Sequence, residues 1–283
     1  MLDLVRCEFT KLKRRKITLM LIVLSCFFPL IVVMTTKNGM SGDLSTHYLK
    51  MRFDLSFTMT QGYGLVFLAP CLIGMLATIL FFMERDNDTF KNIRTVPVTI
   101  TKMILAKICV LFIYGTLFSL ASVSFTIFFS WILKVGIIYD LAYKLGFSII
   151  FGLVITIASL PIVVIIVYFN KSYLVSTLLA FFYSILNWGI IGLFETMAVK
   201  GTAKFLNLFP VICAMDWTSG KLVDHVIKDN LSKEAYIMFP SDIYAFLVLG
   251  VTLFLSLMLM IDFIKNGRGN LNGKYYINRV IKN

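Results

Sequence analysis

Residues 145–169 read LGFSIIFGLVITIASLPIVVIIVYF, a run without a single charged side chain. A helix of about 20 apolar residues crosses the hydrocarbon core of a bilayer, so this run is long enough for one span. Five other uncharged runs have a similar length: 17–36, 62–83, 108–133, 174–194 and 243–261. The pattern predicts an all-α integral membrane fold with six transmembrane helices.

The composition of the 283-residue chain leads to the same class of protein. Hydrophobic residues make up 59% and charged residues 15%, with a mean hydropathy of +0.87. A soluble globular chain has about 45–50% apolar and about 25% charged residues. The five cysteines show no CxxC and no regular spacing, which argues against a disulfide framework or a metal site. A soluble enzyme, a DNA-binding domain and a secreted disulfide module are therefore excluded.

Lys and Arg are distributed unevenly on the two sides of the six expected spans. Segments on the side of the N-terminus hold 17 of them, and segments on the other side hold 10. Because cytoplasmic segments carry the excess of basic residues, both termini are expected in the cytoplasm. The net charge of +12 then reflects attraction to anionic membrane lipid, and no nucleic acid is needed to explain it.

The N-terminal segment 1–16 has the pattern of an amphipathic helix. Val5, Phe9 and Leu12 fall on one face at i, i+4 and i+7, whereas Glu8 falls on another. We expect this helix to lie in the inner membrane interface. Its basic cluster at the headgroups consists of Lys11, Lys13, Arg14, Arg15 and Lys16. A plain positive-inside anchor would explain the charges but not the apolar face.

The segment 84–107 is built as a helix, a proline turn and a second helix. The polar side chains at 86–88 offer N-cap oxygens, and Phe90 and Ile93 share one face of the helix that follows. Pro97 ends that helix. The arrangement predicts a small docking surface.

This segment resembles a loop of the permease subunits of type-2 ABC exporters. In that family an acidic residue precedes Gly-Thr-(Leu/Phe)-Lys-Asn, then Pro-(Val/Ile)-(Ser/Thr), then a Lys some ten residues on. The residues that match are Glu84, Thr89, Phe90, Lys91, Asn92, Pro97, Val98, Thr99 and Lys107. Asp88 stands where the family usually has Gly. Span count and loop lengths extend the resemblance over the whole chain.

The resemblance implies that 84–107 is the coupling segment, with Ile93 on its apolar face, and that it docks on a separate cytoplasmic ATPase. ATP and Mg would bind that partner, so this chain would be neither an enzyme by itself nor a cofactor protein. A second permease copy, or a related permease, would complete the transporter. The chain looks most like permeases of the bacterial bacitracin-resistance and lantibiotic-immunity group. That likeness implies a bacterial plasma membrane and a hydrophobic or amphipathic substrate, such as an antimicrobial peptide.

The outer segment 195–242 is the largest element between spans. Residues 205–217 are too short to cross and fit a re-entrant or interfacial segment, with Pro210 opening a helix. Leu222 and Val226 predict a second amphipathic helix. The segment could act as a gate or as a lid. The single transmembrane domain would cover 1–264, and 265–283 would form a basic tail.

Polar residues within the spans are few and mild. Those that could line a translocation path are Tyr114, Ser119, Tyr183 and Asn187. Helix packing explains these residues more simply, and the small residues Gly115 and Gly152 also favour it. The stretch TQGYG at 60–64 is similar to a potassium filter, but a flexible start of the second span explains its glycines more simply.

Two other functions compete with the transporter. A channel or passive pore would need no ATPase. A membrane enzyme is disfavoured because no catalytic constellation occurs: the two histidines stand alone, and no expected span carries a central acidic residue or histidine. The stretch GRGNLNGK at 267–274 lacks the spacing of a nucleotide-binding loop, so ATP is not expected on this chain.

Overall fold

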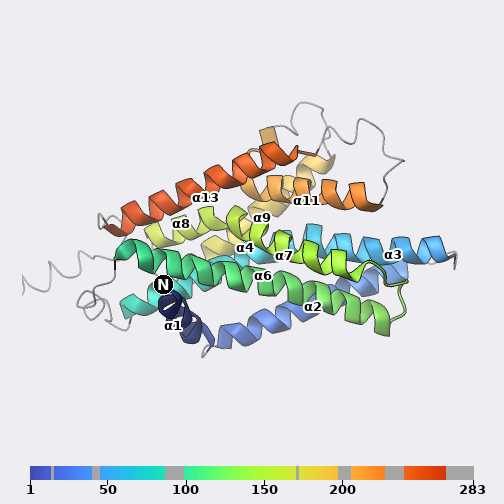
Figure 1. Cartoon of the computed structure of the whole chain (residues 1–283), viewed down its shortest axis with the longest axis horizontal. Helices are drawn as coiled ribbons and strands as arrows, with labels where there is room; N and C mark the ends of the chain where they lie inside the picture. The colour runs from blue at the N-terminus through green and yellow to red at the C-terminus, as the bar shows by residue number, and fades with distance from the viewer. Residues whose placement is uncertain are drawn as a thin grey trace, which may run out of the picture.

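The computed structural model describes residues 1–13, 16–39, 45–86, 99–169, 172–196, 205–226 and 239–265. Helices account for the regular structure throughout these ranges (Figure 1). Their bounds are α1 Leu2–Lys13, α2 Lys16–Gly39, α3 Thr46–Met59, η1 Thr60–Leu65, α4 Val66–Asp86, α6 Ile100–Ile132, α7 Leu141–Ala158, α8 Leu160–Phe169, α9 Tyr173–Thr196, α11 Pro210–Val226 and α13 Asp242–Lys265. The all-α prediction is confirmed for the described part of the chain.

Five helical stretches are long and apolar enough to cross a membrane. They are Thr46–Met83, Ile100–Ile132, Leu141–Phe169, Tyr173–Ile191 and Asp242–Lys265. They account for five of the six expected spans. The remaining one falls on α2, where the apolar stretch found among the described residues is the shorter Val23–Gly39.

The second span begins much earlier than the sequence suggested. Residues 46–61, expected to be mostly an outer loop, form α3 and the start of η1, a π-helical segment that continues into α4. Charged residues in α3 are accommodated because other segments supply partners. Arg52 donates from Nη2 to the carbonyl of Lys37 at 3.0 Å, and Asp54 is buried in an ion pair described below.

Several helices pack closely where small residues lie at their contacts. A Cβ atom added at Gly152 of α7 would lie 2.7 Å from the Thr116 Cα of α6, and one added at Gly115 would collide with Thr156. On the other side of the bundle, a Cβ at Gly74 of α4 would lie 2.5 Å from the Cβ of Ala180 in α9. Gly115 and Gly152, which the sequence associated with close helix packing, thus lie where α6 and α7 approach each other.

The fourth span is divided into α7 and α8 at Ser159. Pro161 lies two residues further on and has no N–H to donate, so an uninterrupted helix would lack a hydrogen bond there. The Ser159 N–H bonds to the carbonyls of Ile155 and Thr156 at 3.0 and 3.2 Å, which closes the end of α7.

In the described residues 205–226, the expected interfacial segment and the start of the expected second helix fall largely on one helix, α11. Pro210 begins α11, as predicted, but the helix continues through Leu222 to Val226 without a break. Leu222 is buried in the hydrophobic core, so it does not present an apolar face to solvent. Figure 1 shows α11 alongside α13 in one half of the bundle, and it also packs against α7. Residues 197–204 and 227–238 lie outside the described part of the chain.

Candidate functional site

The N-terminal helix α1 lies across the bundle beside α6 (Figure 1). Leu12 is fully buried, Val5 and Phe9 pack against the core, and the Phe9 ring stacks on Tyr114 of α6 at 5.3 Å. Residues Leu2–Lys13 of the predicted segment 1–16 are helical, and Val5, Phe9 and Leu12 share a partly buried face. That face packs on protein, so its location in a membrane interface stays a prediction.

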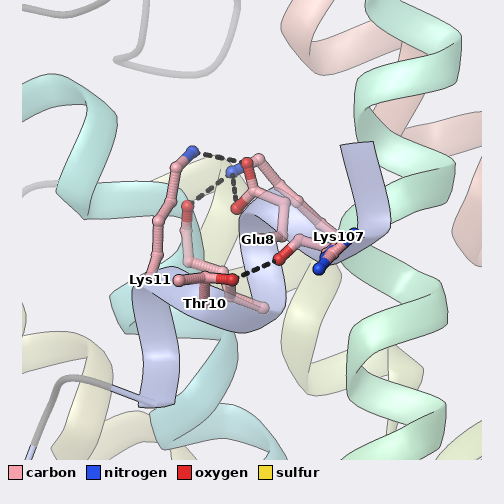
Figure 2. A network of polar contacts seen from close by, with 6 residues as sticks. Glu8, Thr10, Lys11 and Lys107 are labelled. Carbon is pink, nitrogen blue, oxygen red and sulfur yellow. Dashed lines mark hydrogen bonds and ion pairs between the residues drawn. The ribbon is translucent and has the colours of Figure 1, made fainter. Parts of the chain in front are cut away.

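Glu8 was expected on a polar face of α1, and the structure corrects this. Glu8 is buried, and its Oε2 lies 3.2 Å from the ammonium of Lys107 in α6 (Figure 2). Its other oxygen accepts from Lys11 at 2.5 Å. A buried carboxylate requires a paired cation, and the amphipathic pattern gave no sign of a lysine 99 positions away.

Lys107 connects three helices. Its side chain is fully buried, and its ammonium donates to Glu8 of α1 and to the carbonyl of Leu80 in α4 at 2.7 Å. The same ammonium lies 5.4 Å from the centre of the Phe81 ring, within reach of a cation–π interaction. We call the residues Glu8, Leu80 and Lys107 the lysine junction.

The lysine junction sits at the base of the predicted coupling segment. Helix α4 ends at Asp86, and α6 begins at Ile100 with Thr99 as an extended N-cap residue. Glu84 lies in the last turn of α4. The predicted coupling residues Asp88, Thr89, Phe90, Lys91, Asn92, Ile93 and Pro97 lie outside the described part of the chain. Lys107 is thus the member of the predicted set whose contacts are seen.

The predicted basic cluster is only partly described. Lys11 is half-buried through its contact with Glu8, and Lys13 is exposed at the end of α1. Lys16 begins α2, and Arg14 and Arg15 lie outside the described residues. Their role at lipid headgroups stays a prediction.

A second buried ion pair lies where the sequence predicted only outer loops. Asp54 of α3 accepts from Lys144 of α7 at 2.8 Å, and both side chains are nearly fully buried. The hydroxyl of Tyr139, in the segment between α6 and α7, donates to the other Asp54 oxygen. Burial, and then the hydrogen bond to this carboxylate, raises the pKa of Tyr139, so the phenol remains a donor at neutral pH.

A chain of polar contacts runs from this pair into the bundle. The Ser148 hydroxyl donates to the Lys144 carbonyl at 2.7 Å, and Gln61 Nε2 donates to the Ser148 hydroxyl at 3.0 Å. Ser119 of α6 donates to the Ser148 carbonyl at 2.8 Å. Gln61 is fully buried in η1, and its Oε1 has no hydrogen-bond partner. The chain therefore joins η1, α6 and α7 through polar groups.

A family model described as an ABC-2 family transporter protein matches residues 4–187, well over half of the chain. The chain belongs to the ABC-2 transporter family. Searches of curated proteins and of solved structures return no significant match. The matched range covers both buried ion pairs and the whole predicted coupling segment. An ABC-2 permease implies an ATPase partner, in agreement with the sequence-based expectation.

The four residues proposed to line a path in this ABC-2 permease are engaged in helix contacts. Tyr114 stacks on Phe9, and Ser119 bonds across to α7. On α9, the Tyr183 hydroxyl donates to the Ala158 carbonyl at 3.3 Å, and Asn187 donates to the Tyr183 carbonyl at 2.8 Å. Tyr114 and Ser119 lie on α6, and Tyr183 and Asn187 lie on α9, so the packing interpretation accounts for these four contacts.

Among the described residues, Trp217, Lys221 and Asp242 form a further polar cluster. A cavity of about 310 Å³ between α11 and the start of α13 is lined by Trp217, Lys221, Phe239 and Asp242, among others. Asp242 accepts from the Trp217 indole at 2.8 Å and from the Lys221 ammonium at 2.9 Å. Among the described residues, no three His, Cys, Asp or Glu side chains are grouped for a metal ion.

Proposed function

We propose that this ABC-2 protein is the permease subunit of an ATP-driven exporter, and that residues 84–107 form the surface on which its ATPase docks. The lysine junction carries the proposal. It fixes both ends of that segment, because Lys107 near the start of α6 binds the Leu80 carbonyl near the end of α4. The same ammonium holds α1 through Glu8.

This geometry suits transmission of force. A partner that displaces the 84–107 segment would pull on two helices that are tied to each other and to α1. Because a buried charge costs several kcal/mol when it loses its partner, the three helices would move together rather than separately. Movement at the docking surface would then reach α6, which extends over 33 residues.

A second permease copy is part of the proposal. Helices α9 and α13 have the least buried apolar stretches among the five long ones, at 28% and 33%, against 78% for Thr46–Met83. Lipid and a partner permease would share these two surfaces. A hydrophobic or amphipathic substrate, such as an antimicrobial peptide, fits the family likeness and the apolar character of the helices. The bias of Lys and Arg supports cytoplasmic termini in a bacterial plasma membrane.

The test compares two lysines on one helix. Lys107→Met removes the ammonium from the lysine junction and leaves Glu8 with Lys11 as its remaining cation, whereas Lys102→Met changes an exposed lysine five positions earlier. Phe90→Asp would place a charge on the apolar face of the coupling segment. Each tagged permease is co-expressed with candidate ATPases, purified, and assayed for bound ATPase and for ATP hydrolysis.

We expect Phe90→Asp to abolish ATPase binding, since small interfaces depend on one or two apolar anchors. Lys107→Met should retain part of the binding but uncouple hydrolysis from substrate, and Lys102→Met should behave as the parent. Parent-like binding and hydrolysis by Phe90→Asp would refute the docking surface. A purified permease that moves substrate without any ATPase would favour the passive pore.

A further inference from the structure

The ammonium of Lys144 is enclosed by groups that recognise cations. The carboxylate of Asp54 lies 2.8 Å away, and the centres of the Tyr139, Phe53 and Phe57 rings lie at 4.0, 4.9 and 5.6 Å. A carboxylate combined with aromatic ring faces is a common solution for binding alkylammonium ions. We call Phe53, Asp54, Phe57 and Tyr139 the cation box.

We propose that the cation box is a binding site for a primary alkylammonium group, and that Lys144 occupies it as an internal ligand. Three of the four walls lie about 90 positions before the occupant, and the fourth, Tyr139, lies five positions before it, with its carbonyl 3.5 Å from the Lys144 ammonium. Phe53, Asp54 and Phe57 belong to α3. Tyr139 belongs to the connection between α6 and α7, and Lys144 belongs to α7. The box can therefore keep its form while its occupant changes.

The walls are held together independently of Lys144. Gly136 packs so closely on α3 that an added Cβ would collide with the Leu49 carbonyl and lie 3.1 Å from the Phe53 nitrogen. The Ile137 N–H donates to the same Leu49 carbonyl at 3.3 Å. These contacts fasten the connection to α3 and bring Tyr139 beside Asp54.

The occupant lies in the first turn of α7, whose Lys144 N–H donates to the Asp140 carbonyl at 3.0 Å. Asp140 precedes α7 in the left-handed conformation, with φ 50°, and its side chain makes no capping bond to the helix. Tyr139 is half-buried, and the exposed Lys50 lies over its ring at 5.4 Å, so the box reaches the molecular surface on that side.

The cation box could take up a ligand by exchanging the Lys144 ammonium for the ammonium group of that ligand. An empty box would leave a buried carboxylate without a cation, which is strongly unfavourable. Lys144 therefore leaves only as another cation arrives. In the exporter proposed above, a cationic amphipathic substrate would replace Lys144 and so release α7 from α3. That last step rests on the proposed function, whereas ligand binding to the box does not.

The test is chemical rescue of the full chain in detergent. Lys144→Ala removes the atoms beyond Cβ, and n-propylammonium supplies the same three carbons and nitrogen. We expect n-propylammonium to raise the melting temperature of Lys144→Ala by about 2–4 °C, because the ligand binds the folded state. Neutral 1-propanol should have no such effect. If Lys144→Ala folds poorly, recovery of folded protein by n-propylammonium during expression and purification is the readout.

Three controls define the site. The parent protein and Lys50→Ala keep Lys144 in the box and should not respond. The double variant Asp54→Asn with Lys144→Ala lacks the carboxylate and should lose the rescue. Absence of rescue in Lys144→Ala, by melting and by yield, would overturn the proposal, and so would an equal response of the double variant. None of these measurements requires an ATPase or transport, so failure here leaves the proposed function standing.

Discussion

Asp54 and Lys144, 90 positions apart, form a buried ion pair at one end of the bundle, while Glu8 and Lys107, 99 positions apart, form another at the opposite end. Each pair joins helices that no short connection holds together. The first joins α3 to α7, and the second joins α1 to α6 and, through Leu80, to α4. Charged side chains of this kind usually face solvent. Here the two buried pairs connect helices at both ends of an apolar bundle.

The first prediction concerns the Asp54–Lys144 pair. Asp54→Asn or Lys144→Met alone leaves a buried charge uncompensated, so each should destabilise the protein by about 3–5 kcal/mol. The double variant removes both charges and should cost clearly less than the sum. A double-mutant cycle from thermal melting in one detergent measures this coupling. Additive losses would show that the pair contributes no interaction energy.

The second prediction concerns helix packing at two glycines of α7. Gly152→Ala should destabilise by about 1–3 kcal/mol, because the new methyl group would meet the α6 backbone at 2.7 Å and force the helices apart. Gly146→Ala meets nothing within 4 Å and should be neutral or stabilising by up to about 1 kcal/mol. Equal melting temperatures for the two variants would contradict the close packing of α6 and α7.

The third prediction concerns thiol reactivity. Burial, with a smaller contribution from Asp216, raises the pKa of Cys213 above its ordinary value. Because the thiolate is the reactive form, Cys213 should resist maleimide at neutral pH and react faster only as the pH rises. Cys7 is exposed on α1 and serves as the control. The measurement is the labelling rate of two single-cysteine variants in detergent, and rapid labelling of Cys213 at pH 7 would disprove its burial.

The fourth prediction concerns orientation in the membrane. With cytoplasmic termini, the start of α3 faces outward and the segment 84–107 faces inward. In a cysteine-free background, His47→Cys should react with an impermeant maleimide on intact cells, whereas Asn92→Cys should react only after lysis. The reverse pattern would place the coupling segment outside and rule out an ATPase there.

The sequence predicted the long helices well because their signal is local. An uncharged run of sufficient length indicates a span whatever surrounds it. Helix α3 was missed for the same reason. Lys50, Arg52 and Asp54 interrupt the apolar run, and nothing nearby in the sequence shows that Asp54 is neutralised from α7. Ser45 caps the start of that helix, and the pairing of Asp54 with Lys144 allows its charged part to be buried.

For the candidate sites too, the sequence showed local features but not the partners that come from distant parts of the chain. Lys107 was selected by its place in a family motif, but its burial and its partners could not be foreseen, because Glu8 appears in the sequence as one polar residue among several on α1. Gln61 was read as part of a flexible start to a span. The structure instead buries it in η1, where its amide contacts α7. Pairings across about 90 to 100 positions leave no periodic trace in one sequence.

Helices α3 and α4 form one long helix, and the π-helical segment Thr60–Leu65 lies between them. This segment rotates the side-chain positions of α3 around the helix axis relative to those of α4. A π-turn holds an extra residue compared with an α-turn, and one residue corresponds to about 100° of rotation around the axis. The face that α3 presents to Lys144 and the face that α4 presents to α9 are therefore set separately. Deletion of a single residue from this turn would rotate one half against the other and turn Asp54 away from its lysine. The extra residue in the π-turn thus lets α3 face α7 while α4 faces α9.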